Sequence, residues 1–258
     1  MDIKELFDLS GRVALVTGGS RGLGLQMAEA LGEMGAKVAI TARKAKELSN
    51  AETHLRQRGI EVLTHSCDLS DPSVPKPLVD TVMAQWGRID ILVNNAGTTW
   101  GAPMEDHPLE AWQKIIALNL TAMFLLTQAV GKATMIPRRT GRIINIASIA
   151  GLSGTEPAFM STIGYNTTKA GVVNFTKSLA CEWGKHNIHV NAIAPGVFPS
   201  KMSQGMINQS EKYILEHTPL RRLGTDRDLK GVIVLLASDA SDFMTGTVIP
   251  VDGGFAAL

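Results

Sequence analysis

The stretch Arg12-Val-Ala-Leu-Val-Thr-Gly-Gly-Ser-Arg-Gly-Leu-Gly24 joins an apolar run to a glycine-rich loop. Residues 12–17 are predicted to form a buried strand, because the apolar run is continuous and ends in glycines. A helix is predicted to follow, because apolar side chains recur along a single stripe at Leu23, Met27, Ala30, Leu31 and Met34. Glycines between a strand and a helix let the backbone approach a pyrophosphate, which the N-terminus of the helix attracts. The stretch therefore predicts a dinucleotide-binding loop, and a tight turn without a ligand is the alternative.

The same alternation of strand and helix continues to the end of the chain. Further β-rich runs lie at residues 37–41, 61–65, 90–93, 142–147, 188–193 and 247–251. Helical patterns fill the gaps, notably at residues 109–133 and 165–184, and Asp71-Pro72 looks like a helix start. This order predicts an α/β fold, a Rossmann-type doubly wound parallel sheet of about seven strands with helices on both faces. We expect a single domain over residues 1–258, in which the irregular segment at about 196–224 is a substrate lid or, alternatively, a surface connection.

The composition argues against several classes of protein. Apolar residues make up 45% of the 258 residues and charged residues 19%, so the chain can bury a large core. A net charge of +1 offers no field for nucleic acid or an anionic membrane. Cys67 and Cys181 cannot build a disulfide framework, and the six histidines show no convincing zinc spacing, so we expect no metal. Residues 1–8 lack the apolar region of a signal peptide and the apolar runs are far shorter than a membrane span, so the expected location is the cytoplasm.

The end of the second predicted strand indicates which dinucleotide binds. An NAD site places an acidic residue about 20 residues after the glycine loop, on the ribose hydroxyls. This chain has Thr41-Ala-Arg-Lys44 there, and no acid before Glu47. A cation suits the 2′-phosphate of NADP(H), and Arg21 in the loop is placed to hold the same group. We therefore predict NADP(H) rather than NAD(H), although both Arg21 and Arg43 have an alternative as ordinary solvated residues.

Tyr165-Asn-Thr-Thr-Lys169 places a phenol and an ammonium on one face of a helix. Acid–base chemistry near pH 7 requires the tyrosine pKa of about 10 to fall by about three units, or about 4 kcal/mol. A lysine at about 5 Å supplies about 3 kcal/mol at an effective dielectric constant of 20. A bound oxidised nicotinamide, itself cationic, is a source of the remainder. The spacing is adequate for catalysis, but a solvated helical pair has the same pattern.

Three other polar positions interrupt apolar elements. Ser148 ends the strand at residues 142–147, where its hydroxyl is placed to bind a substrate carbonyl. Asn119 lies within the long helix at residues 109–133, although asparagine is a poor helix former; a satisfied buried amide or a small kink is the alternative. Asn94-Asn-Ala-Gly97 follows another strand, where the simplest interpretation is a turn.

Together these residues resemble the short-chain dehydrogenase/reductase family. The resemblance spans Gly11 to Gly254 and replaces none of the family's catalytic positions. Its motifs are the loop from Thr17 to Gly24, Asp68, Asn94-Asn-Ala-Gly97, Asn119, Ser148, Tyr165, Lys169, Pro195-Gly196 and Val251-Asp-Gly-Gly254.

The resemblance implies a set of cofactor-binding residues. The pyrophosphate turn would involve Gly18, Ser20, Arg21, Gly22, Leu23 and Gly24, and Arg43 would meet the 2′-phosphate. Asp68 and Leu69 would meet the adenine, with Asn95, Ala96 and Gly97 near the adenosine ribose. The nicotinamide end would involve Pro195, Gly196, Val197 and Ser200, where the family often has threonine in place of Ser200, together with Tyr165 and Lys169.

The resemblance also implies the catalytic roles. Tyr165 would give a proton to a carbonyl oxygen in reduction and take it back in oxidation. Lys169 would hold the nicotinamide ribose and lower the pKa of Tyr165, while Ser148 would orient the carbonyl. Asn119 would hold a water in a proton relay to Lys169. The chain is thus expected to be an enzyme that interconverts a carbonyl and a secondary alcohol.

Within the family the chain most resembles 3-oxoacyl-[acyl-carrier-protein] reductases, especially the rhamnolipid-associated type. The matching stretches are Asn94–Gly101, Ile193–Met202 and Thr245–Phe255. This implies a 3-oxoacyl thioester substrate from fatty acid metabolism. Trp100, Phe159 and Met160 are candidates for an apolar wall against an acyl chain, with core or interface positions as the alternative. The 16 residues Ile149 to Gly164, which separate Ser148 from Tyr165, are several more than is usual in the family, so the pocket is expected to be reshaped.

The resemblance implies partners as well. Arg139 matches a basic position that holds the acidic carrier protein, and Lys185 and His186 stand at the second such position; a solvated turn is the alternative for Arg138-Arg139. Family members are usually homotetramers or dimers. The main functional alternative is a gluconate 5-dehydrogenase-like polyol or sugar-acid enzyme, and a remote one is a non-catalytic dinucleotide-binding protein.

Overall fold

One parallel sheet organises the computed structural model, which describes residues 2–156 and 159–257. Its strand order is β3-β2-β1-β4-β5-β6-β7. The strands are β1 (Val13–Thr17), β2 (Lys37–Ala42), β3 (Val62–Ser66), β4 (Ile91–Asn94), β5 (Gly141–Ile146), β6 (Ile188–Pro195) and β7 (Val248–Val251). The order reverses between β1 and β4, so a crevice opens there at the carboxyl ends of the strands. The predicted Rossmann-type sheet is confirmed, with every strand within two residues of its predicted bounds.

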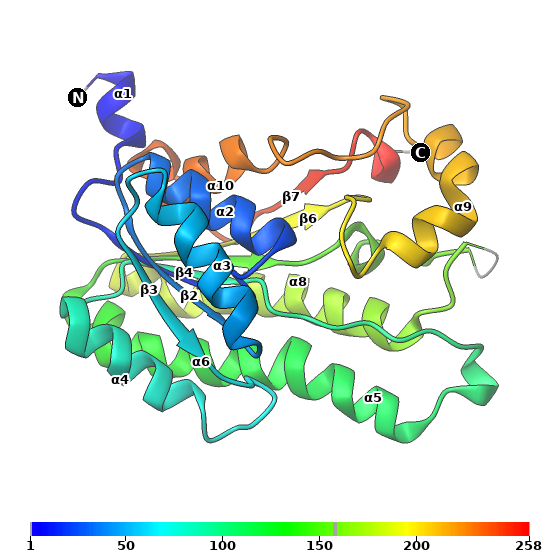
Figure 1. Cartoon of the computed structure of the whole chain (residues 1–258), viewed down its shortest axis with the longest axis horizontal. Coiled ribbons are helices and arrows are strands. Elements are labelled where there is room, and N and C mark those ends of the chain that lie inside the picture. Colours follow the sequence, from blue (N-terminus) through cyan, green and yellow to red (C-terminus); the bar gives the residue numbers. More distant parts are fainter. Residues whose placement is uncertain (1, 157–158, 258) are drawn as a thin grey trace.

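Helices cover both faces of the sheet. They are α1 (Ile3–Phe7), α2 (Gly22–Glu33), α3 (Ala45–Arg56), α4 (Pro75–Trp86), α5 (Leu109–Ile116), α6 (Ala122–Val130), α7 (Ile136–Arg138), α8 (Ile163–Trp183), α9 (Gln204–His217) and α10 (Lys230–Ala237). Side chains of β1 alternate between two cores, because Ala14 and Val16 pack with α2 and α10 whereas Val13 and Leu15 pack with α4, α6 and α8. Figure 1 shows these two layers above and below the sheet.

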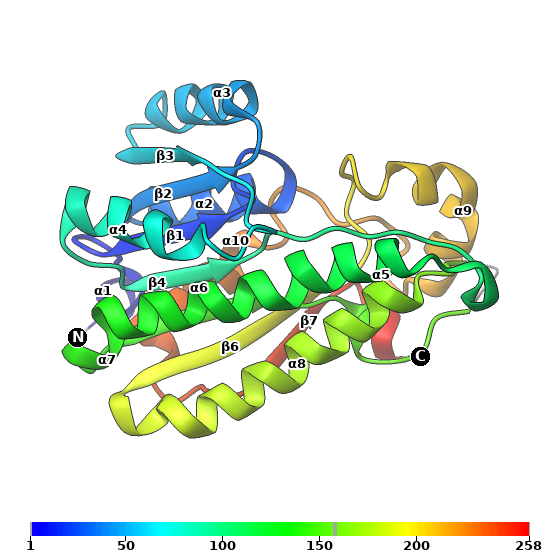
Figure 2. The ribbon, with the colours of Figure 1, turned by 90° about the horizontal axis from the view of Figure 1, so that it is seen from below.

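Helix α9 stands apart from both layers. Figures 1 and 2 place it beside the C-terminus, at the end of the sheet where the strands finish. It occupies the middle of the segment predicted as a lid, and Ser210 interrupts it with a non-helical backbone, φ −132° and ψ 20°. Ile207 and Ile214 anchor its two halves by burial.

Two features differ from the sequence prediction. Helix α4 begins at Pro75 and not at Asp71-Pro72, because Asp71 forms a turn in which its carboxylate accepts from the Ser73 N–H at 2.9 Å. The continuous helical run Leu109–Arg138 has 30 residues and contains an 18-residue window with a mean hydropathy of 1.4, which by length and composition alone is enough to cross a membrane. This run was not predicted from the sequence, because polar residues such as Asn119 and Gln128 interrupt its apolar stretches. The packing of Leu126 and Val130 in the core accounts for its apolar character.

A buried polar ladder fixes α6 and α8 on the sheet. Asn94 and Asn145 are directly opposed on β4 and β5, and the Asn94 amide donates to Asn145 Oδ1 at 2.9 Å. The same Asn94 amide donates to Thr127 on α6 at 3.0 Å, and the Asn145 amide donates to Thr176 on α8 at 2.9 Å. A buried amide left without a partner is costly, so the ladder admits one register for each helix.

Replacing Asn145 should therefore destabilise the whole domain. Asn145→Ala removes one bond to each neighbour and leaves a cavity, so the free energy of unfolding should fall by roughly 3 kcal/mol. Asn174→Ala, an exposed amide on α8, is the matched control and should change it by less than about 0.5 kcal/mol. Urea denaturation at equal protein concentration measures both, and equal small effects would show that the ladder does not set the packing.

Candidate active site

A cavity of about 990 Å³ lies at the carboxyl ends of the strands and gathers nearly all the predicted site residues. It is lined by the loop after β1, the ends of β2 and β3, the turn after β4, Ser148 after β5, the segment after β6, and Tyr165 and Lys169 of α8. Of the residues predicted for catalysis or cofactor binding, Asn119 alone is missing from this lining. A fold with parallel strands brings these distant segments together because all its strands end at the same edge.

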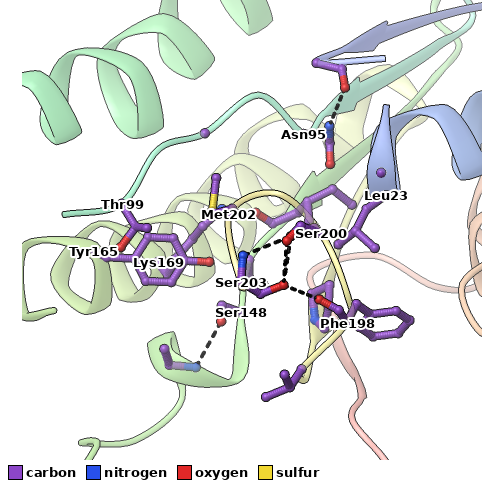
Figure 3. Close-up of a pocket in the computed structure, with 18 of the residues that line it drawn as sticks. Leu23, Asn95, Thr99, Ser148, Tyr165, Lys169, Phe198, Ser200, Met202 and Ser203 are labelled. Carbon is purple, nitrogen blue, oxygen red and sulfur yellow. Dashed lines mark hydrogen bonds between the residues drawn. The ribbon is translucent and has the colours of Figure 1, made fainter. Parts of the chain in front are cut away.

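The glycine loop is shaped by positions where a side chain does not fit. Gly18 has φ +65°, and a Cβ on Gly24 would lie 2.2 Å from the Gly18 carbonyl oxygen. The loop is also tied to the turn after β4: the Asn95 amide donates to the Thr17 carbonyl at 2.8 Å and to the Gly18 carbonyl at 3.3 Å, and Figure 3 shows Asn95 pointing toward this loop. The Asn95 and Ala96 N–H groups both donate to Thr17 Oγ1 at 2.9 Å. The side chain of Asn95 thus binds the loop itself, a positioning role that the sequence did not indicate.

One end of the cavity holds a cluster of cations paired with acids. Arg21 lies 2.9 Å from Glu47, Lys44 lies 3.4 Å from the same carboxylate, and Arg43 lies 3.8 Å from Asp68. Partial burial opposes ionisation of Asp68, but hydrogen bonds from Ser70 and the charge of Arg43 outweigh it and lower its pKa. Both arginines line the cavity as exposed, solvated side chains, each within reach of an acidic partner. Glu47, in the first turn of α3, was not predicted as a site residue, because Arg21, which it contacts, lies far from it along the chain.

The other end presents Ser148, Tyr165 and Lys169 together (Figure 3). Burial raises the pKa of Tyr165, and a hydrogen bond with Ser148 partly opposes that rise. Ser148 Oγ also accepts from the Ala150 N–H at 3.2 Å, which fixes the hydroxyl at the end of β5. Ser148 therefore lies next to the phenol of Tyr165. This is the position expected of a group that orients an oxygen atom bound beside the phenol.

Lys169 is buried under the end of β5. Its ammonium donates to the Ile146 carbonyl at 2.6 Å and lies 5.6 Å from the centre of the Tyr165 ring, over its face. Burial lowers the pKa of Lys169 to about 8. The sequence predicted that Lys169 lowers the pKa of Tyr165. In the structure this pKa is raised instead, because the ammonium faces the ring and burial of the phenol has the larger effect.

Asn119 lies in a wider π-helical turn, Ala117–Thr121, between α5 and α6. Its Oδ1 accepts from the Thr98 N–H at 2.8 Å, and its amide donates to the Thr98 carbonyl and to Thr168 Oγ1, each at 3.0 Å. Both amide donors are thus used within the protein, in agreement with the satisfied buried amide that was the alternative. Asn119 and Lys169 do share a separate void of about 10 Å³, where Asn94 Oδ1 has no hydrogen-bond partner among the described residues.

The segment after β6 closes the cavity against the glycine loop. A Cβ on Gly22 would lie 3.9 Å from the Ser200 Cβ, so this segment touches the loop. Figure 3 shows Ser203 bridging it internally: the hydroxyl of Ser203 lies 2.9 Å from that of Ser200 and donates to the Phe198 carbonyl at 2.5 Å. Ser200, predicted to meet the nicotinamide end of the cofactor, thus lines the cavity close to the glycine loop.

Beyond Ser148 and Tyr165 the lining includes both apolar and polar side chains. The larger apolar ones come from three separate segments and are Phe159, Met160, Met202, Met206 and Phe255; polar ones beside them are Thr155, Glu156, Thr162 and His217. Phe159 and Met160 were predicted, but the prediction for Trp100 was wrong: Trp100 does not line the cavity and packs edge-on against His107 with ring centres 4.9 Å apart. Tyr213, His217 and Phe255 also line the cavity and were missed, because nothing in their local sequence marks them.

The predicted basic docking position lies away from this cavity. Arg139 donates to the Lys185 carbonyl at 2.7 Å, so the two basic segments do meet. They meet at the far end of α8 from Tyr165, however, and a helix of 21 residues is about 30 Å long. Arg138 does not form a solvated turn, because it binds the buried carboxylate of Asp90 at 2.9 Å.

Comparison with known proteins agrees with this geometry. A family model described as enoyl-(acyl carrier protein) reductase matches residues 18–256. The chain is 38% identical to gluconate 5-dehydrogenase of Gluconobacter oxydans over 98% of each chain. It is also 38% identical to the rhamnolipids biosynthesis 3-oxoacyl-[acyl-carrier-protein] reductase of Pseudomonas aeruginosa, over 96% of this chain and 98% of that one. A crystal structure of a gluconate 5-dehydrogenase from Burkholderia cenocepacia, in complex with NADP and tartrate, superimposes with a TM-score of 0.93 at 32% identity and covers all of both chains.

The buried ammonium predicts an unusual effect on stability. Folding lowers the pKa of Lys169 from 10.5 to about 8, which costs roughly 3 kcal/mol at pH 7, where the unfolded lysine stays protonated. Lys169→Met removes that cost and loses a hydrogen bond of about 1 kcal/mol, so the free energy of unfolding at pH 7 should rise by about 2 kcal/mol.

The sign of the pH dependence provides the check. Because the unfolded state binds the proton more tightly, wild-type stability from this group rises between pH 8 and pH 10.5, and the gain of the variant should approach zero by about pH 10. Urea denaturation at both ends of this range measures it, with Lys177→Met, an exposed lysine of α8, as control. A gain that did not change with pH would contradict the assignment to the buried charge.

Proposed function

Because the chain belongs to the short-chain dehydrogenase/reductase family, we propose that this oxidoreductase uses NADP(H) to reduce a 3-oxoacyl thioester to the 3-hydroxyacyl product. The observation that carries the choice of substrate is the group of apolar side chains that line the cavity beyond Ser148 and Tyr165, namely Phe159, Met160, Met202, Met206 and Phe255. An acyl chain gains free energy from burial against such a surface. Polar side chains, among them Glu156 and His217, line the cavity beside them, and Glu156 accepts a hydrogen bond from Tyr213 at 2.8 Å.

The opposite half fits the cofactor. The glycine loop brings its backbone to the cavity without side chains at Gly18, Gly22 and Gly24, as a pyrophosphate requires. Arg21, Arg43 and Lys44 line the cavity where the 2′-phosphate would lie. The cofactor supplies the hydride, which would add to the carbonyl carbon. We propose that Asp68 and Leu69 hold the adenine and that Ser200 and Val197 hold the nicotinamide end.

The proton in this reaction comes from Tyr165. Burial raises its pKa, so the phenol holds its proton until the carbonyl oxygen becomes strongly basic. The hydroxyl of Ser148, which shares a hydrogen bond with the phenol, would bind the same carbonyl oxygen and orient it. Lys169 has a pKa of about 8, which suits a group that returns a proton to the phenolate near neutral pH.

Asn119 would act by position. It fixes the backbone of Thr98 through two hydrogen bonds and shares a void of about 10 Å³ with Lys169. A volume of about 10 Å³ is roughly that of one water probe, and the unpartnered Asn94 Oδ1 supplies a hydrogen-bond acceptor for a water there. These features support the proposed relay of protons through water to Lys169.

A sugar-acid dehydrogenase is the second candidate, supported by 38% identity to gluconate 5-dehydrogenase of Gluconobacter oxydans. A non-catalytic role is disfavoured, because Ser148, Tyr165 and Lys169 are brought together and desolvated, which a binding module does not require. A homotetramer, a cytoplasmic location and docking of a carrier protein at Arg139 and Lys185 stay predictions. Since that pair lies about 30 Å from Tyr165 along α8, a carrier docked there would not present its thioester to the cavity of the same chain without a long tether.

The cofactor assignment predicts a clear preference. NADPH should bind at least about tenfold more tightly than NADH, or about 1.4 kcal/mol, because the arginines pair with the 2′-phosphate. Arg43→Ala should remove most of this ratio by weakening NADPH alone. Lys46→Ala changes an exposed cation of α3 outside the cavity lining and should leave the ratio intact. Titration of cofactor fluorescence measures all six affinities, two for each of the three proteins, and equal binding of NADH by the wild-type protein would refute the assignment.

A substrate panel tests the reaction itself. With NADPH, acetoacetyl-CoA and longer 3-oxoacyl-CoA esters should be reduced, and gluconate should give little turnover with NADP+ or NAD+. Tyr165→Phe should lower kcat by at least about a hundredfold while NADPH binding stays within about threefold, because only the proton donor is lost. Faster turnover of gluconate than of every thioester would instead establish the second candidate.

A further inference from the structure

Four aromatic rings meet at the outer end of the apolar half of the cavity. Phe159 stacks on Tyr213 with ring centres 5.1 Å apart and lies 6.1 Å from Phe255. Tyr213 in turn stacks on His217 at 3.9 Å. We call Phe159, Tyr213 and Phe255 the aromatic wall. Its members come from the segment before α8, from α9 and from the short helix Phe255–Ala257, so the wall exists only where these three segments meet.

The wall belongs to the cavity and not to the core. All three rings line the cavity, and none is among the fully buried residues of the hydrophobic clusters. Phe159 lies on the segment of 16 residues between Ser148 and Tyr165, which is longer than is usual in the family. Two residues of this segment, Glu156 and Phe159, contact Tyr213 of α9.

One hydrogen bond holds the two larger segments together. The Tyr213 hydroxyl donates to Glu156 Oε2 at 2.8 Å, three residues before Phe159. That hydrogen bond also raises the pKa of Tyr213, so the phenol remains a donor at neutral pH. The break at Ser210 separates the half of α9 that carries Tyr213 from the half that carries Met206, so each half presents its own side chain to the cavity.

We infer that the aromatic wall binds the distal carbons of the acyl chain and makes the enzyme favour longer 3-oxoacyl thioesters over the acetoacetyl ester. The inference rests on the proposed function. In the proposed reaction the carbonyl group lies at Ser148 and Tyr165. Met202 and Met206 line the same cavity on the side of α9. The acetoacetyl ester has a single methyl carbon beyond its reacting carbonyl group and so has no further carbons to place against the wall, whereas a longer chain desolvates its own surface and that of the rings.

The test is a ratio of two specificity constants. Wild-type kcat/KM should be at least about tenfold higher for a long-chain 3-oxoacyl-CoA than for acetoacetyl-CoA, equal to about 1.4 kcal/mol. Phe159→Ala should remove most of that ratio by lowering kcat/KM for the long ester alone, and Phe159→Leu should restore part of it by returning apolar volume. Both substrates share the coenzyme A moiety, so the ratio isolates the acyl chain.

Two controls separate the rings from other effects. Phe243→Ala removes a fully exposed ring that does not line the cavity, and should leave the ratio unchanged. Tyr213→Phe keeps the ring and loses the bond to Glu156, so the ratio should persist even if KM rises for both esters. A ratio abolished by Tyr213→Phe, or equal losses for both esters in Phe159→Ala, would overturn the assignment of chain selection to the rings.

The outcomes also distinguish this inference from the proposed function. Reduction of both esters with equal kcat/KM by the wild-type protein would leave the proposed function standing and refute the wall. Absence of turnover with any 3-oxoacyl ester would refute both.

Discussion

The burial of the Lys169 ammonium beneath the end of β5 is the constraint on which the rest of the site depends. A buried charge is tolerated only where it has a fixed partner, and Lys169 finds it in the Ile146 carbonyl at 2.6 Å. That bond places the first turns of α8 against β5, and so places Tyr165 beside Ser148. The Asn94–Asn145 ladder holds the same helix further along through Thr176. Burying the Lys169 ammonium thus lowers the free energy of unfolding, and the helix packing that the ladder fixes offsets this loss.

The two halves of the cavity use opposite physical chemistry. At one end, Arg21, Arg43 and Lys44 are kept in place by Glu47 and Asp68, so the cations are oriented by weak, exposed pairs. Such pairs can be exchanged for a dianionic phosphate at little cost, because solvent already screens them. At the other end, the buried phenol and ammonium are shielded from water, where each charge interacts strongly with its neighbours. The proposed cofactor selection therefore depends on surface charge, whereas the proposed catalysis depends on burial.

The sequence predicted those features that are encoded locally. Apolar runs and glycines located all seven strands, and the strand-to-helix loop led directly to Gly18 and Gly24. Features that depend on contacts between distant segments were missed. Glu47 enters the site only by reaching Arg21, and Tyr213 only by stacking on Phe159. Trp100 was misplaced for the same reason, since its neighbour His107, and not its apolar character, decides where the ring lies. The role of Asn119 was likewise set by Thr98, which sequence spacing does not reveal.

The difference between locally encoded features and long-range contacts also explains why the chain is equally similar to relatives from two substrate classes. The chain is 38% identical both to a gluconate dehydrogenase and to a 3-oxoacyl reductase, so overall identity does not separate the two classes. The substrate half is instead built from a few side chains on three segments that the rest of the fold does not constrain. One ring on the long segment before α8 and one on α9 change its polarity with hardly any change in overall identity. Under the proposed function, the information that selects the substrate would lie in how Phe159, Tyr213 and Phe255 meet in space.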